Sequence, residues 1–342
     1  MKVRTTPESG SVTIKDVARQ AKVSIATVSR ALNTPDKVSD GVVLRVQAAA
    51  RMLGYVPYRA ARSLVSRRFN AVGAIVPTID NAIFAKATQA LQNQLNAHGY
   101  TLLLASTEYD SEREMAEIRS LVEHGVDGIV LVGAEHRPGV ERLLEAKRIP
   151  FVNTWIYDTA SGVPCIGFDN RKAMARLTRY LLDLGHRRFA MIAGITRHND
   201  RAAQRVIGVR ETLAAHGLDL RNDCLIECPY TIADGRSALA MFVTRPQPPT
   251  AVICGNDVLA FGALFECLAR GVRVPQNLSI TGFDDLDLAS HVLPPLTTMR
   301  VPAVEMGVRA ADYLIARGTG DALPDRVELE PSLIVRGTTA PA

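Results

Sequence analysis

From Asn70 onward, short runs of β-forming residues alternate with longer segments of helical periodicity, in two successive sets. This alternation is typical of open parallel sheets with helices on both faces. The expected strands are residues 71–76, 101–105, 128–132 and 151–153, then 189–193, 225–227, 251–254 and 279–283. The expected helices are residues 83–98, 111–124 and 139–147, then 173–184, 202–216, 235–243 and 258–270. Two sets in tandem predict two lobes whose strand-end loops face one cleft, where ligands of such sheets bind.

The residues before this region are strongly basic. Residues 1–68 contain thirteen Lys and Arg against four Asp and Glu, a net charge of +9, whereas the remainder contains 27 basic and 31 acidic residues, a net charge of −4. A small basic unit joined to a larger acidic one is typical of nucleic-acid-binding proteins. The alternative, a basic solubilising arm, would lack the apolar periodicity that this segment has.

Three short helices are expected in residues 13–56. Thr13 and Asp16 form a capping-box arrangement at the start of the first helix, and Ser24 is the expected N-cap of the second. The third helix is expected to end at Gly54. Because the turn between the first two helices is so short, they must cross steeply. This is the helix-turn-helix arrangement, in which the second helix lies in a DNA major groove.

The outward side chains of the second helix are the candidate DNA contacts. Arg30 can form a bidentate contact with guanine, and Ile25 and Ala26 can contact a thymine methyl group. Short hydroxyl side chains beside them suit phosphate oxygens. The candidate DNA contacts here are Ser24, Ile25, Ala26, Thr27, Ser29, Arg30 and Asn33. A generic helical hairpin with an exposed arginine is the alternative interpretation.

The segment TIKDVARQAKVSIATVSRALN, followed by LGYVP and ARSL, closely resembles the LacI family of bacterial transcriptional repressors. The resemblance implies that the segment after Pro57 is a hinge helix that becomes ordered on operator DNA. It also implies that Leu64 inserts into the minor groove at the operator's centre, with Arg62, Arg67 and Arg68 beside the phosphates. An apolar side chain inserted between base pairs unstacks them and bends the DNA onto more protein surface. A linker leucine packed on the second unit is the alternative for Leu64.

The resemblance extends along the rest of the chain, in LGHRRFAMIAG, RVIGVRETLAAHGL, CGNDVLAFG, ITGFDDLDLA and PPLTTMRVPAVEMG. It implies a type I periplasmic-binding-protein-like fold and a small effector in the cleft, most often a sugar or sugar derivative. Matched motif to motif, it implies effector contacts from Arg205, Asn256 and Asp284. An aspartate accepts hydrogen bonds from vicinal hydroxyls, an arginine donates a planar fork, and an asparagine does both. Helix capping is the alternative for Asp284 and Asp285, and it is the expected role of Asp257.

Aromatic residues near strand ends are candidates for stacking on the apolar face of a sugar. Phe84 stands where relatives commonly carry Asn-Pro followed by aromatic residues, and Trp155, the single tryptophan, follows an expected strand. Asn153 in the same segment and Phe168, where the chain first passes between the lobes, complete the candidate effector site. The segment around Asn153 departs from the acid-containing loop of relatives, which leaves the identity of the effector open. Asp169 is expected to cap the next helix.

The expected organisation is a flexible tail (1–12), a helix-turn-helix DNA-binding domain (13–56), a hinge helix or linker (57–69) and an effector-binding and dimerisation domain (70–338). The N-lobe is expected to comprise about 70–169 and 303–328, and the C-lobe about 170–302 and 329–338. After Pro331 we expect a last strand and a frayed tail. The tail lacks the leucine heptads of a tetramerising helix, so a homodimer on a pseudo-palindromic operator is expected.

Enzymatic activity has little support, since the sequence lacks the G-x-S-x-G, H-E-x-x-H, Walker and G-x-G-x-x-G motifs. No cofactor or metal is expected, and the five scattered cysteines are expected to be reduced, buried thiols. No apolar run reaches the ~18 residues that span a bilayer. The first residues lack the apolar core of a secretory signal, so a cytoplasmic location is expected.

The expected function is that of an operator-binding transcriptional regulator, a repressor controlled by a small effector. Two alternatives are an effector-independent architectural DNA-binding protein and a cytoplasmic sugar-binding protein. Saturable stabilisation by a small molecule would exclude the first alternative.

Overall fold

The computed structural model describes residues 12–56 and 68–342. Contacts divide the chain into two compact units, Met1–Phe69 and Asn70–Ala342, which we call the head and the body. The fold class expected from the sequence is confirmed: a small helical unit precedes a two-lobed α/β unit with parallel sheets.

The head contains α1 (Ile14–Ala21), α2 (Ile25–Asn33), the 3-10 turn η1 (Pro35–Lys37) and α3 (Asp40–Leu53). The predicted helix ends are present. The backbone N–H and the hydroxyl of Thr13 both donate to the Asp16 carboxylate, at 3.0 and 2.7 Å. The N–H of Thr27 donates to Ser24 Oγ (3.1 Å), and Gly54 has a left-handed φ of 66°. The buried core comprises Val17, Ala18, Ala21, Val28, Ala31, Val46, Ala49 and Ala50.

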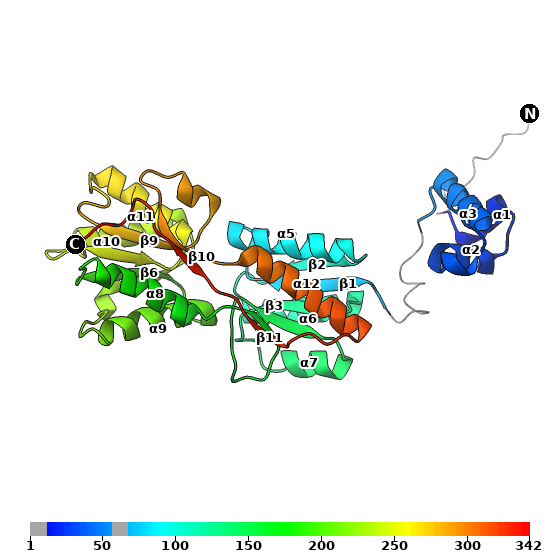
Figure 1. The fold of residues 1–342 in the computed structure, drawn as a ribbon, viewed down its shortest axis with the longest axis horizontal. Coiled ribbons are helices and arrows are strands. Elements are labelled where there is room, and N and C mark those ends of the chain that lie inside the picture. Colours follow the sequence, from blue (N-terminus) through cyan, green and yellow to red (C-terminus); the bar gives the residue numbers. More distant parts are fainter. Residues whose placement is uncertain (1–11, 57–67) are drawn as a thin grey trace, which may run out of the picture. The chain divides into compact units, whose positions relative to one another are not determined.

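The body contains two six-stranded sheets, one in each lobe (Figure 1). The strand order is β11-β5-β4-β3-β1-β2 in the N-lobe and β12-β10-β9-β8-β6-β7 in the C-lobe. Strand pairs in the described chain are parallel except β10 with β12. The helices cover the faces of the sheets, as expected for an alternating sequence of this kind.

The N-lobe elements are β1 (Ala71–Val76), α5 (Ala82–Ala97), β2 (Thr101–Ser106), α6 (Ser111–His124), β3 (Gly128–Val132), α7 (Val140–Lys147), β4 (Phe151–Thr154), β5 (Cys165–Gly167), α12 (Ala303–Thr319) and β11 (Arg326–Glu328). The C-lobe elements are α8 (Asn170–Asp183), β6 (Phe189–Gly194), α9 (Asp200–Ala214), η2 (Asn222–Cys224), β7 (Leu225–Cys228), α10 (Ile232–Val243), β8 (Ala251–Cys254), α11 (Asp257–Arg270), β9 (Ser279–Asp284), η3 (Asp287–Ser290), β10 (Thr297–Arg300) and β12 (Ser332–Ile334). Every strand and helix predicted in the body is therefore present, within a few residues at each end.

The chain passes between the lobes three times. The passages lie between β5 and α8, between β10 and α12, and between β11 and β12. Because α12 and β11 return to the N-lobe, each lobe contains residues from both halves of the body. The strand-end loops of both sheets flank these passages. The loops of one lobe therefore lie beside those of the other.

The last residues are not frayed, and that expectation was wrong. Thr338 is fully buried, its hydroxyl accepts from the N–H of Thr297 (2.9 Å), and its carbonyl accepts from the N–H of Ile280 (2.9 Å). The N–H of Ala342 donates to the carbonyl of Leu184 (2.9 Å). These bonds anchor the segment after β12 on the C-lobe, although its sequence has no strand or helix periodicity.

Helices α5 and α12 pack closely at Gly307. A Cβ atom at this position would lie 2.3 Å from the carbonyl oxygen of Ala87 on α5. Gly307→Val is therefore expected to lower the free energy of unfolding of the body by about 3 kcal/mol, because the helices must separate. Arg309→Val places the same side chain on an exposed part of α12, and its effect should stay within about 1 kcal/mol. Urea unfolding checks both values; similar losses for the two variants would contradict the close-packing argument.

Candidate functional site

The surface of α2 displays most of the predicted DNA contacts. Five of these side chains are exposed: Ser24, Ile25, Ala26, Arg30 and Asn33. Thr27 and Ser29 are half-buried and have partners within the head, since Thr27 Oγ1 lies 2.8 Å from Ser24 Oγ and Asn33 Nδ2 donates to Ser29 Oγ (3.3 Å). The predicted hinge contacts Arg62 and Leu64, and Arg67, lie outside the described residues.

A cavity of about 30 Å³, which we call the inner cavity, lies where strand-end loops of the two lobes meet. Six predicted effector residues line it: Phe84, Trp155, Phe168, Arg205, Asn256 and Asp284. They come from α5, from the loops after β4 and β5, from α9, and from the ends of β8 and β9. Residues far apart in the sequence meet here because the carboxyl ends of both parallel sheets face the same space.

Arg205 and Asp284 give the inner cavity its charge. Arg205 Nη1 donates to the carbonyl of Gly255 (2.8 Å), and its guanidinium lies 4.6 Å from the centroid of the Phe283 ring. Asp284 is buried, and burial raises the pKa of its carboxyl group well above the ordinary value, although Arg205 opposes this. Its backbone φ is 119°, a conformation that non-glycine residues rarely adopt. The structure thus holds an arginine fork beside a carboxyl group that no described residue hydrogen-bonds.

Aromatic rings form the other walls of the inner cavity. The rings of Phe84 and Trp155 meet edge to face with their centroids 5.0 Å apart, and those of Phe168 and Phe283 are 6.0 Å apart. Asn170 Nδ2 donates to the Trp155 carbonyl (2.9 Å), which fixes the loop after β4. Such walls suit the apolar face of a sugar ring, with polar groups at one end to bind hydroxyls.

Asn153, also predicted to contact the effector, does not line the inner cavity. It is buried, and its Oδ1 lies 3.1 Å from His136 Nε2 within the N-lobe. The physical reason lies at the end of β4. Trp155 has a left-handed φ of 67°, so the alternation of side chains that would have placed residues 153 and 155 on one face is broken there.

Four polar cavity residues were not predicted: Asn81, Asn170, Arg201 and Tyr230. Tyr230 follows β7 and Asn170 begins α8, so their positions just after strands were a usable signal. Arg201 lies in the first turn of α9, one turn before Arg205, and helical spacing places the two on the same side.

Asp257, which follows β8, has structural partners within the C-lobe. Asp257 does not cap α11 as expected; the cap is Asn256, whose Oδ1 accepts from the N–H of Leu259 (3.0 Å). Asp257 is fully buried and accepts from the Thr298 hydroxyl (2.6 Å) and the Leu286 N–H (2.7 Å). Burial raises its pKa to about 7. Asp257 therefore ties the segment after β9 and strand β10 to α11.

Helix capping was the alternative for Asp285 and the expected role of Asp169, and of these two only Asp169 caps a helix. Asp285 pairs with Arg300 (2.6 Å) and Arg336 (2.7 Å) and caps no helix. Asp169 accepts from the N–H of Lys172 (2.9 Å) and is the N-cap of α8, as expected.

A larger space, the outer cleft, adjoins the inner cavity and has a volume of about 690 Å³. Asn81 and Tyr230 line both spaces. Tyr109, in the loop after β2 of the N-lobe, and Tyr230, in the loop after β7 of the C-lobe, lie with ring centroids 6.2 Å apart. Burial raises the pKa of the Tyr109 phenol above its ordinary value.

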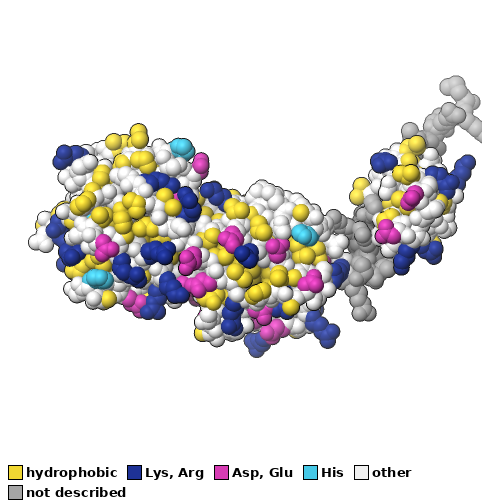
Figure 2. Space-filling model, viewed as in Figure 1, with side chains coloured by type: hydrophobic (Ala, Val, Ile, Leu, Met, Phe, Trp, Pro, Cys, Tyr) yellow, Lys and Arg dark blue, Asp and Glu magenta, His cyan; other side chains and the backbone are white. Residues whose placement is uncertain are grey.

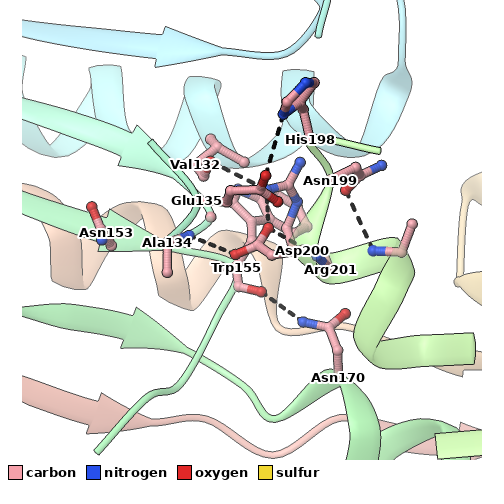
Figure 3. A network of polar contacts seen from close by, with 12 residues as sticks. Val132, Ala134, Glu135, Asn153, Trp155, Asn170, His198, Asn199, Asp200 and Arg201 are labelled. Carbon is pink, nitrogen blue, oxygen red and sulfur yellow. Dashed lines mark hydrogen bonds and ion pairs between the residues drawn. The ribbon is translucent and has the colours of Figure 1, made fainter. Parts of the chain in front are cut away.

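Contacts around the start of α9 connect the two lobes across the cleft (Figure 3). The N–H of Ala134 donates to Asp200 Oδ2 (2.6 Å), and Arg201 Nη1 donates to the Val132 carbonyl (3.2 Å). His198 Nδ1 lies 3.2 Å from Glu135 Oε1. We call this set the clasp. It holds the loop after β3 of the N-lobe against α9 of the C-lobe, beside the inner cavity.

His136 supports the clasp from inside the N-lobe. Its Nδ1 lies 2.7 Å from Glu114 Oε1, and its Nε2 lies 3.1 Å from both the Gly133 carbonyl and Asn153 Oδ1. Its side chain is only 3% exposed. Burial opposes protonation, but the hydrogen bond and charge of Glu114 outweigh it and raise the pKa of His136. Acceptors at both ring nitrogens fit a doubly protonated imidazole.

The stability that His136 confers should fall as the pH rises. Because the folded-state pKa is raised, the contribution is fully present below the unfolded pKa of about 6.5 and is lost as the pH rises through the folded pKa. In urea unfolding, the difference between the native chain and His136→Gln is expected to be larger at about pH 6 than at about pH 8.5. Taking this difference removes the titration of Asp257 and His186, which both proteins share. A difference independent of pH would show that the pKa of His136 is the same in the folded and unfolded chain, which would contradict the raised pKa.

Within residues 12–56 and 68–342, no helix is long and apolar enough to cross a membrane, and no group of three or more His, Cys, Asp or Glu side chains could hold a metal ion. The five cysteines form no disulfide, and all but the half-buried Cys224 are buried.

Two family models match the chain: bacterial regulatory proteins of the lacI family over residues 13–58, and periplasmic binding proteins and sugar binding domain of the LacI family over residues 70–327. The HTH-type transcriptional repressor CytR of Escherichia coli K12 is 33% identical over 332 residues, covering 96% of each chain. A LacI-family transcriptional regulator from Silicibacter pomeroyi superposes with a TM-score of 0.89 at 27% identity, covering 96% of this chain and 99% of that one. The transcriptional regulator CelR in complex with cellobiose superposes with a TM-score of 0.69 at 28% identity, covering 96% of this chain and 99% of that one.

Proposed function

The chain belongs to the LacI family of bacterial regulatory proteins, and on this basis we propose that it is a repressor of transcription that binds a specific operator and is controlled by a small effector. The observation that carries the proposal is the combination, in one chain, of a basic helix-turn-helix head with a cavity that holds an arginine fork beside a buried carboxyl group. The relatives named above are regulators, and we propose no enzymatic activity.

DNA recognition is assigned to the exposed surface of α2. Its N-terminal residues enter the major groove, where Arg30 contacts guanine and the exposed Ile25 and Ala26 contact thymine methyl groups. Lys and Arg side chains elsewhere on the head bind phosphates without reading sequence (Figure 2).

Arg30→Ala is expected to relax the preference at one base pair of each half-site, with a loss of about 1–3 kcal/mol on the preferred sequence. Binding to duplexes with each of the four base pairs at that position, at constant salt, checks this. Arg19→Ala on α1 is a suitable comparison, since it removes an exposed arginine that is not on α2. If Arg30→Ala loses the same affinity for all four duplexes, Arg30 contacts a phosphate rather than a base.

The segment 57–69 is assigned the role of a hinge that becomes ordered on DNA. Leu64 inserts at the central base step of the operator, and Arg62 binds a neighbouring phosphate. A short basic helix between two compact units is marginally stable alone, so its formation on DNA gives the body a means of controlling affinity.

The proposed effector is a sugar or sugar derivative bound at the inner cavity. Asp284 accepts hydrogen bonds from hydroxyls, Arg205 and Asn256 donate, and the Phe84, Trp155 and Phe168 rings cover the apolar face. The cellobiose complex of a similar regulator supports this class of ligand. Effector binding changes how the lobes meet at the clasp, and a preference for one lobe arrangement is what couples it to DNA affinity.

A homodimer is proposed because each head reads one half-site of a pseudo-palindromic operator. The C-lobe offers an apolar surface for it. Exposed hydrophobic side chains on α10, on α11 and before β10 include Met241, Phe265, Leu268 and Leu293, the last 90% exposed. Figure 2 shows hydrophobic side chains gathered over this lobe, of the kind that marks a protein interface.

We assign DNA binding to residues 13–56, the hinge to 57–69 and effector binding and dimerisation to 70–338, and place the protein in the cytoplasm on chromosomal DNA. Selection of bound duplexes from a random-sequence pool tests the central claim, with the selected duplex then used to screen sugars for an effect on affinity. Enrichment of a pseudo-palindrome with a deformable central step is expected. Folded protein that enriches no sequence, with or without sugars, would contradict the proposal.

A further inference from the structure

The space available for a ligand is unequally divided between the inner cavity and the outer cleft. The inner cavity, about 30 Å³, has room for about two water molecules. The outer cleft, about 690 Å³, falls within the usual range for small-molecule pockets of about 300–1,000 Å³. With the lobes placed as they are, the inner cavity admits the hydroxyl groups of a sugar but not its whole ring.

The outer cleft has aromatic surface at its junction with the inner cavity. Tyr230 lines both spaces, and Tyr109 lies beside it from the opposite lobe, with a ring centroid separation of 6.2 Å. The charges of Arg201, Arg205 and Asp284 also act on the Tyr109 phenol. A ligand that reaches Asp284 from the outer cleft must therefore pass these two rings.

Part of the outer cleft wall is apolar. Ile195, which is 47% exposed, lines it together with Pro229, Val258 and Leu286. Asp80 and Arg197 also line the cleft, Glu108 is paired with Arg113 (2.7 Å), and His198 Nδ1 lies 3.2 Å from Glu135 Oε1. One side of a ring can pack on these apolar groups while the tyrosine rings cover another.

We propose that the effector is a glycoside with two rings rather than a free monosaccharide, a refinement that depends on the effector function proposed above. The hydroxyl-bearing edge of the sugar ring enters the inner cavity at Asp284 and Arg205. The second ring, which is a further sugar or an aromatic group joined to the anomeric carbon, lies in the outer cleft against Tyr109 and Tyr230. A monosaccharide would leave most of the outer cleft filled with water.

The test compares ligands that share a sugar, by calorimetric titration of the full-length protein: glucose with cellobiose and phenyl glucoside, galactose with lactose, and ribose with purine and pyrimidine nucleosides. In at least one series the two-ring compound is expected to bind about tenfold more tightly than its parent sugar. Equal affinity in every series that binds would overturn the two-ring proposal but leave the effector function standing. Absence of binding by every compound would overturn both.

Variants in the outer cleft locate the second ring. Tyr109→Ala is expected to lower the affinity for the two-ring ligand about fivefold to tenfold and the affinity for the parent sugar less than twofold. Tyr109→Phe keeps the aromatic ring, so both affinities should stay as in the native chain. Ile195→Asp, at an exposed position, places a carboxylate in the cleft and should have the same selective effect. Thermal unfolding confirms that each variant is folded. Equal losses for the two-ring ligand and the parent sugar would show that the second ring lies elsewhere.

Discussion

Arg205→Ala is expected to lower effector affinity about 100-fold or more and to abolish the effector's influence on operator binding, while operator affinity without effector is retained. The guanidinium is held at the inner cavity by the Gly255 carbonyl (2.8 Å), the Arg201 carbonyl (3.2 Å) and the Phe283 ring. A charge-assisted bidentate bond contributes about 1.5–3 kcal/mol, and its loss also leaves ligand hydroxyls without a donor in a buried site.

Two variants separate this effect from general damage. Arg210→Ala removes an exposed arginine from the same helix, where it contacts Asn222, and effector binding should be unchanged. Arg205→Lys keeps the charge without the planar fork and should recover only part of the affinity. The measurements are effector titration and operator binding with and without effector. If Arg205→Ala folds normally and still responds fully to effector, Arg205 does not contact the ligand.

Ala26→Glu is expected to lower operator affinity more than 100-fold without destabilising the head. Ala26 is exposed in the first turn of α2, where a carboxylate interacts favourably with the helix dipole, so folding is maintained. The same carboxylate would face the DNA, where it repels phosphates and cannot accept a bond from the thymine methyl group that Ala26 is proposed to contact.

Ala26→Gln is the matched control, because it has the size of glutamate without its charge. Its affinity should fall between those of the native chain and Ala26→Glu, and salt titration should show the larger electrostatic component in Ala26→Glu. Equal operator affinities for the native chain and Ala26→Glu would place another surface of the head on DNA.

Local patterns in the sequence predicted the elements because each depends on nearby residues. The capping pairs of α1 and α2 and the apolar runs of the parallel strands are short-range signals. Six cavity residues could be proposed because they stand at strand ends or in family motifs, and parallel topology brings such positions together.

Features that depend on long-range contacts or on single backbone angles could not be predicted. Asn153 was predicted to contact the effector but does not line the inner cavity. The left-handed φ of Trp155, which redirects the chain there, cannot be read from a sequence. Asp257 binds Leu286 and Thr298, which are 29 and 41 residues away, and no local pattern records that. The clasp depends on how the two lobes face each other, so Asp200 and Arg201 gave no signal of their partners.

The order of strands in the N-lobe sheet has a consequence for synthesis of the protein on the ribosome. Strand β5 ends at Gly167, but its outer partner β11 begins only at Arg326, and α12, which packs on α5, begins at Ala303. The lobe made first is therefore completed almost last, and the edge of β5 stays without its neighbour while all of the C-lobe before β12 is translated. An uncovered strand edge can pair with other chains. Nascent chains truncated within the C-lobe should therefore depend on chaperones far more than the finished protein does.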